Sequence, residues 1–204
     1  RIKYDIRNYL EYLENELKAA QKAYDLDVHM NTEITTQQLK AKKDDAVIYA
    51  IGTRSGTPKI SGLGKIKHVE ATDLLLDESL LGDAKNIVVV GGGDTASDCV
   101  GTAFRQGAVK VTQLDIRPQP PEKEDKLAVW PYWATKMRTS SSQAEGATRE
   151  FQVATLSFVG EDGNLTHVKC CEVDEKRKPI AGKEFFIKAD LAFVAIGFAG
   201  PLKG

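Results

Sequence analysis

The sequence contains little cysteine and no long apolar run. Its three cysteines form no C-x-x-C pair, which excludes a redox-active dithiol and a cysteine-held iron–sulfur cluster within this chain. No stretch is apolar over the length that a transmembrane helix needs, so we expect no membrane partner, and we expect no signal peptide. The formal net charge of −1 indicates no basic surface for nucleic acid. Unpaired cysteines fit a reducing compartment, so we expect a cytoplasmic protein.

The apolar residues that are present are sufficient for a core. The chain has 204 residues, of which 42% are hydrophobic, and this suits one large domain or one and a half small ones. It starts at Arg1 and enters a helical pattern at once. We therefore expect a piece of a longer protein.

The most informative segment is a strand–turn–helix–strand pattern over residues 85–117. An apolar run leads into Gly91-Gly92-Gly93-Asp94-Thr95-Ala96, and a helical pattern and a second strand-like segment, Val111-Thr112-Gln113-Leu114-Asp115, follow. The spacing G-x-G-x-x-A is a dinucleotide-binding fingerprint in its proper context. Gly91 allows the sharp turn, Gly93 lets a pyrophosphate approach the backbone, and Ala96 lets the helix pack closely on the strand. The pyrophosphate is expected on the free N–H groups at the start of the helix.

Three charged residues accompany the fingerprint. Asp115 ends the second strand, where its carboxylate can accept hydrogen bonds from ribose hydroxyls and would repel a 2′-phosphate, which favours NADH over NADPH. Arg117 could pair with that phosphate instead, or with Asp115, because both side chains lie on the same side of a strand. Asp94 either caps the helix or contacts the nicotinamide ribose through water.

Apolar periodicity predicts elements before the fingerprint. We expect helices over 2–24, over 35–42 with Thr35 as cap, and over 71–81. We expect strands over 26–30 and 45–53, the second of them buried.

After the fingerprint, a Pro-rich irregular segment over 117–150 is a loop or lid candidate. Its Trp130 and Trp133 either anchor the loop or stack on a nucleotide ring. Alternating runs then predict three antiparallel strands with a hairpin turn at 162–164, followed by a buried strand that returns to the main sheet. The runs cover residues 151–159, 165–173, 183–188 and, for the return strand, 189–196.

This order predicts an α/β fold: a Rossmann-like NAD(P)-binding domain with a parallel sheet, a three-stranded antiparallel excursion, and a remnant of an FAD-binding domain. It is the layout of a nicotinamide-binding domain inserted into an FAD domain. The chain crosses between the two at Gly52-Thr53 and again at Gly197, and we include these three residues among the cofactor-binding candidates. The expected divisions are residues 1–54 (partial FAD domain), 55–195 (NAD(P)H domain) and 196–204 (return segment).

Several motifs together resemble the small-subunit region of glutamate synthase. They are the run 88–102, the segments 111–115 and 118–122, Trp130-Pro131-Tyr132-Trp133, and the end of the chain over 189–201. The Gly-Gly-Gly-Asp-Thr-Ala core is similar to that of the dihydropyrimidine dehydrogenase flavin–nicotinamide module. Residues 6–53 resemble the FAD region of enoate and dienoyl-CoA reductases.

The resemblance implies an NAD(P)H-dependent flavin oxidoreductase in which hydride passes from NAD(P)H to FAD. It implies FAD in the intact parent, and an FAD domain and an electron-acceptor domain or subunit as partners. It assigns Gly91, Gly93 and Ala96 to the pyrophosphate and Asp115 to the ribose. The FAD fingerprint and cluster cysteines of the family do not occur in this chain, so we expect it to be inactive alone.

Two other functions are compatible with the sequence. One is the NAD(P)H/FAD region of an enoate or dienoyl-CoA reductase, and the other is a nucleotide-binding module without redox chemistry. We assign no catalytic residue, because in hydride transfer the cofactors supply the chemistry. We also assign no metal site.

Overall fold

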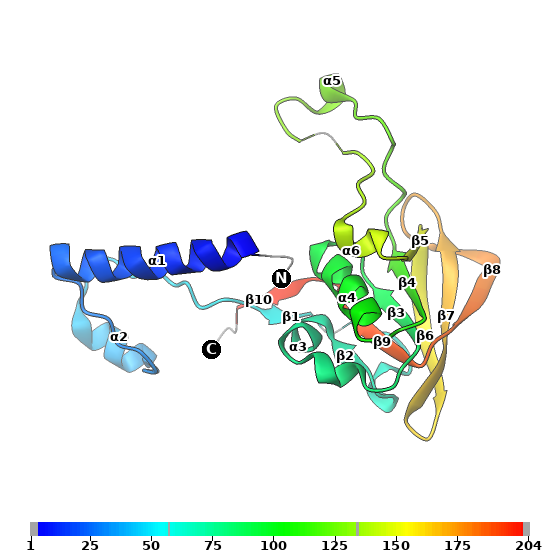
Figure 1. The fold of residues 1–204 in the computed structure, drawn as a ribbon, viewed down its shortest axis with the longest axis horizontal. Coiled ribbons are helices and arrows are strands. Elements are labelled where there is room, and N and C mark those ends of the chain that lie inside the picture. Colours follow the sequence, from blue (N-terminus) through cyan, green and yellow to red (C-terminus); the bar gives the residue numbers. More distant parts are fainter. Residues whose placement is uncertain (1–3, 57, 134, 202–204) are drawn as a thin grey trace. The chain divides into compact units, whose positions relative to one another are not determined.

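The computed structural model describes residues 4–56, 58–133 and 135–201 (Figure 1). The chain divides into two compact units, Arg1–Ala50 and Ile51–Gly204. The first unit contains α1 (Tyr4–Ala23) and α2 (Thr36–Lys42). Both helices were predicted, and Thr35 caps α2 in a capping box with Gln38.

The two strands predicted before residue 54 are wrong. Residues 26–30 and 45–53 have no strand conformation, and their side chains are mostly exposed, with Ile48 at 91%. An apolar run becomes a strand only when neighbouring strands pair with its backbone and cover its faces. Neither segment has such a neighbour in the part of the chain that the structure describes.

The second unit is built on a five-stranded parallel sheet in the order β2-β9-β3-β4-β5. The central strand β3 is covered on both faces, because Val88 and Val89 are both fully buried. This burial explains the uninterrupted apolar run of this strand. The strands are β2 (Val69–Glu70), β3 (Asn86–Val90), β4 (Lys110–Asp115), β5 (Thr148–Phe151) and β9 (Leu191–Val194).

Helices cover one face of this sheet (Figure 1). Helix α4 (Asp94–Arg105) packs Val100 into the same core as Val89 and Phe193. The predicted helix over 71–81 is interrupted at Asp77, whose carboxylate accepts from the N–H of Ser79 at 3.0 Å and starts a new turn. The other helical segments of this unit are η1 (Leu63–Lys65), α3 (Ala71–Leu76), η2 (Glu78–Leu81), α5 (Lys126–Val129) and α6 (Ser141–Ala144).

A three-stranded antiparallel sheet covers the other face. Its Phe158 and Val168 share a core with Val88 and Leu114 of the parallel sheet. A two-residue turn at 162–163 joins its first two strands. The strands are β6 (Val153–Glu161), β7 (Asn164–Val173) and β8 (Pro179–Lys188), in that order. The predicted fold class, a parallel sheet with an antiparallel three-stranded excursion, is confirmed.

The first strand predicted for the excursion, over 151–159, corresponds to β6, and a separate strand, β5, precedes it. Gln152 has a φ of 54°, a left-handed conformation that breaks the extended chain between β5 and β6. Strand β5 therefore ends at Phe151 as the parallel neighbour of β4, and β6 starts at Val153 in the antiparallel layer. The turn carries the chain from one sheet to the other.

The segment between β4 and β5 is largely irregular, as predicted. Trp130 is 82% exposed and Trp133 is 89% exposed. Neither ring anchors the segment by burial, so that prediction is wrong. Near the end of the segment, Arg149 of β5 donates to the carbonyl of Arg138 at 2.9 Å.

The two predicted crossing segments meet in a small antiparallel pair. Strand β1 (Arg54–Ser55) pairs with β10 (Phe198–Gly200). The N–H of Gly56 also donates to the carbonyl of Gly197 at 2.9 Å. The segments that follow Thr53 and Gly197 therefore lie side by side.

Candidate functional site

A cavity of about 450 Å³ lies where the carboxyl ends of β3, β4 and β9 meet. Strands β4 and β9 pair with opposite edges of β3, and ligands of open α/β sheets bind where connections leave a strand in opposite directions. The cavity is lined by the glycine turn after β3, the end of β4, the start of β6 and the segment after β9. The lining residues are Ile60, Val90, Gly91, Gly92, Gly93, Thr95, Leu114, Asp115, Ile116, Arg117, Val153, Ala154, Thr155, Ala195, Ile196 and Gly197.

Most residues predicted for cofactor binding line this cavity. Asp94 and Ala96 do not line the cavity, and Ala96, a residue of α4, is fully buried in the core. Gly52 and Thr53 do not line it either, and both are exposed. Those that line it are Gly91, Gly92, Gly93, Thr95, Asp115, Arg117 and Gly197.

The three glycines of the turn have different surroundings. A Cβ on Gly91 would lie 2.1 Å from the carbonyl oxygen of Ala195, and the φ of Gly91 is 139°. A Cβ on Gly92 would lie 1.8 Å from the Asp115 carboxylate. A Cβ on Gly93 would meet no atom within 4 Å. The fold itself therefore requires Gly91, a side chain at Gly92 would displace the Asp115 carboxylate, and Gly93 faces open space.

Helix α4 starts with free N–H groups beside this open space. Its N-cap is Gly93, which has no side chain to bond them. Asp94 is the first helical residue, so the prediction that Asp94 caps the helix is wrong. Uncapped N–H groups and the positive end of the helix dipole suit a phosphate. A pyrophosphate fits this turn, since neither a side-chain cap nor a Cβ occupies the position it needs.

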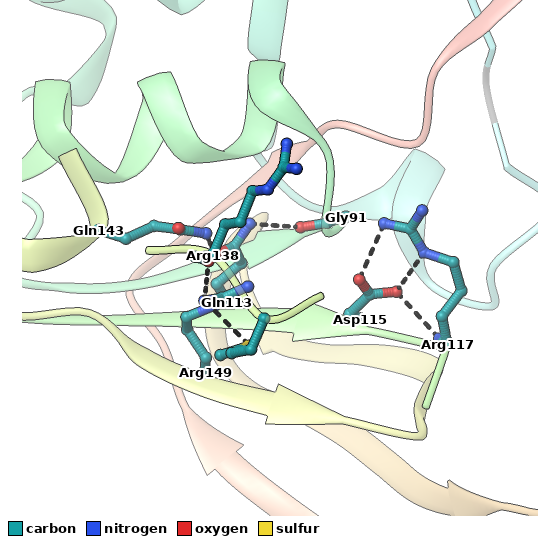
Figure 2. A network of polar contacts seen from close by, with 8 residues as sticks. Gly91, Gln113, Asp115, Arg117, Arg138, Gln143 and Arg149 are labelled. Atoms are coloured by element: carbon teal, nitrogen blue, oxygen red, sulfur yellow. Dashed lines mark hydrogen bonds and ion pairs between the residues drawn. The ribbon is translucent and has the colours of Figure 1, made fainter. Parts of the chain in front are cut away.

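Asp115 and Arg117, which both line the cavity, form an ion pair (Figure 2). One carboxylate oxygen accepts from the backbone N–H and Nε of Arg117 at 2.9 and 3.0 Å, and the other accepts from Nη2 at 2.9 Å. The hydrogen bond to Asp115, and then its charge, raise the pKa of Arg117. Two partners were predicted for Arg117, a 2′-phosphate or Asp115, and in the structure Arg117 pairs with Asp115.

Several residues at or behind this site are not predicted from the sequence. Thr155 and Ile60 come from distant segments, and no local pattern marks them. Among the described residues, the buried hydroxyl of Thr155 has no partner. Gln113 and Gln143 are buried behind the glycine turn. The position of Gln113 in the middle of the second predicted strand was a signal that could have identified it.

None of the three cysteines lines the cavity. All three are free and buried, and burial raises the pKa of Cys99 and of Cys170 to about 12. The described residues contain no cluster of His, Cys, Asp or Glu that could hold a metal ion. Within the same residues, no helix is both long enough and apolar enough to cross a membrane.

The fold and the site together define a Rossmann-like dinucleotide-binding domain that carries an antiparallel three-stranded layer. The profile of the pyridine nucleotide-disulphide oxidoreductase family matches residues 4–203, and the chain belongs to this family.

Its relatives include subunits of larger oxidoreductases. The chain is 34% identical to the glutamate synthase [NADPH] small chain of Mycobacterium tuberculosis, over 85% of this chain and 40% of that protein. It is 32% identical to glutamate synthase [NADH] of Saccharomyces cerevisiae, over 86% of this chain and 10% of that protein. The chain thus spans 40% or less of the length of these two relatives.

Among solved structures, a 2-naphthoyl-CoA reductase complex matches with a TM-score of 0.55 and 23% identity. The match covers 88% of this chain and 24% of that one. At this level of identity the likeness shows the fold alone.

Proposed function

We propose that this chain is the NAD(P)H-binding part of a flavoprotein oxidoreductase of the glutamate synthase small-subunit type. The observation that carries the proposal is the glycine turn, where Gly93 faces open space at the uncapped start of α4. The cavity at the carboxyl ends of three parallel strands supports it. Family membership and the similarity to glutamate synthase small chains point to the same chemistry.

The residues around the cavity have separable roles in this proposal. Gly93 and the first N–H groups of α4 hold the pyrophosphate, and Asp115 with Arg117 faces the adenosine ribose. Thr95 and Gly197 contribute to the wall around the remaining part of the dinucleotide. When bound, reduced nicotinamide supplies the hydride and FAD accepts it. The protein's part is to bind and orient the nucleotide.

The proposed function implies a division of the chain between two domains. Residues 1–54 and 196–204 belong to an FAD domain, and residues 55–195 form the NAD(P)H domain. The pairing of β1 with β10 supports this division, because it joins the two segments where the chain would pass between the domains. The partners are the FAD domain and an electron-acceptor domain or subunit of the parent protein. The free thiols are in keeping with a cytoplasmic location.

The proposal is tested by cofactor binding to the 204-residue chain. We expect NADH or NADPH to bind with one site per chain in titration calorimetry, and we expect the purified chain to contain little or no FAD. The reason is that the fingerprint turn is formed, whereas Gly52 and Thr53, at the FAD-side crossing, are exposed. The proposal would be refuted if neither NADH nor NADPH binds to the chain. A yellow protein with stoichiometric flavin would refute the expectation about FAD.

A further inference from the structure

A buried glutamine in β4 contacts the glycine turn directly. Gln113 is 2% exposed, and a buried amide is costly unless both its ends are hydrogen-bonded. Its Nε2 donates to the carbonyl of Gly91 at 3.1 Å, and its Oε1 accepts from Nε2 of Gln143 at 2.8 Å (Figure 2). Gln113 therefore links the fingerprint turn to α6.

The orientation of both amides is set from α6. Oε1 of Gln143, which is 7% exposed, accepts from the backbone N–H of Ser140 at 3.0 Å in a capping box. The other end of this amide, Nε2, can only donate. It therefore faces Oε1 of Gln113, which leaves Nε2 of Gln113 as the donor to Gly91. The Ser140 hydroxyl also contacts that of Ser97 in the first turn of α4.

This chain of bonds fixes one peptide group of the turn. In a trans peptide the C=O and the following N–H point in opposite directions. When Gln113 holds the carbonyl of Gly91, the N–H of Gly92 is directed away from Gln113. Among the described residues no backbone carbonyl accepts a hydrogen bond from that N–H. A peptide between two glycines has little conformational preference of its own, so without such a contact it would sample other orientations.

We propose that Gln113 and Gln143 are positioning residues of the dinucleotide site, which hold the Gly91–Gly92 peptide in the orientation that the pyrophosphate requires. The inference rests on the proposed function. The contribution is preorganisation: the turn adopts its binding conformation before the ligand arrives, so less conformational entropy is lost on binding. Gln143 acts through Gln113, because it contacts that amide and not the turn.

The test is a double-mutant cycle on NADH affinity in the 204-residue chain. Gln113→Met keeps the side-chain length and removes the amide, and we expect about fivefold weaker binding, the equivalent of one hydrogen bond. Gln143→Met alone should weaken binding by a smaller factor. In the Gln113→Met background it should have no further effect. Gln106→Met is the matched control. Gln106 lies at the C-terminal end of α4, away from the glycine turn, and bonds Glu78. Loss of this amide should leave the NADH affinity unchanged.

The Gly92 amide resonance separates positioning from a loss of stability. In ¹⁵N-labelled protein we expect NADH to shift it strongly in the wild type and in Gln106→Met, and weakly in Gln113→Met and Gln143→Met. Wild-type affinity in both glutamine variants, or additive effects in the cycle, would overturn the inference while leaving the proposed function intact. If the wild type binds no nucleotide, the proposed function fails as well. Should Gln113→Met not fold, Gln143→Met decides alone by affinity and by the Gly92 shift.

Discussion

Alanine substitution at the three glycines of the turn should have three different effects on stability. At Gly91 the new Cβ meets backbone, the carbonyl oxygen of Ala195 at 2.1 Å, and the φ of 139° is unfavourable for alanine. Backbone cannot move as a side chain does, so we expect a loss of roughly 3 kcal/mol or more. At Gly92 the obstacle is the Asp115 carboxylate, which can move at the expense of its bonds to Arg117. We expect a loss of roughly 1–3 kcal/mol there.

Gly93→Ala should act in the opposite direction. Its backbone has a φ of −88° and a ψ of −173°, which alanine adopts without strain, and the Cβ has free space. Removing the glycine restricts the unfolded chain, so we expect a gain of about 0.4–1 kcal/mol. The same free space is where the pyrophosphate is expected, so Gly93→Val should abolish nucleotide binding in a folded protein.

Urea unfolding of the three alanine variants gives the stability series, and calorimetric titration of NADH into Gly93→Val gives the affinity. Circular dichroism of Gly93→Val is the control for folding. The reasoning is refuted if Gly93→Ala loses as much stability as Gly91→Ala. It is also refuted if a folded Gly93→Val binds NADH as the wild type does.

Two further predictions concern charged residues. Asp115→Asn should shift the preference from NADH towards NADPH, because it frees Arg117 and removes a repulsion of about 1–4 kcal/mol with a 2′-phosphate. The ratio of the dissociation constants for NADH and NADPH measures this preference. An unchanged ratio would count against the role of Asp115. At Asp190, burial opposes ionisation, but bonds from Asn86 and Lys85 outweigh it and lower the pKa. Its stabilisation is therefore complete above the unfolded-state pKa of about 3.9 and is lost as the pH falls through the lower folded-state pKa. The difference in urea midpoint between the wild type and Asp190→Ala should shrink over that range, and a difference independent of pH would contradict the assignment.

The elements around the fingerprint could be predicted because local information suffices for them. The run before Gly91 is apolar at every position, the helical spacing after Asp94 is regular, and the glycines mark the turn between them. Each of these patterns is consistent with a single local structure. The hairpin at 162–163 is predictable for the same reason. The open position of Gly93 in the structure agrees with the room that the fingerprint spacing calls for.

Other features depend on partners that are distant in the sequence. The apolar run 45–53 looks like a buried strand, yet no described strand pairs with it, and its backbone stays exposed. Strand β5 was missed because its four residues carry no clear alternation. Pairing with β4, together with the left-handed turn at Gln152, makes it a strand.

The sequence by itself determined that this chain contains a strand–turn–helix unit suited to a dinucleotide, because that unit is encoded by residue types at fixed local spacing. Only the tertiary structure decided what surrounds it. The contact between Gly92 and the Asp115 carboxylate, the closed pair of Asp115 with Arg117, and the bond from Gln113 to Gly91 all depend on the packing of β4 beside the turn. Side-chain contacts between separate elements depend on register and rotamer, which local sequence patterns do not specify.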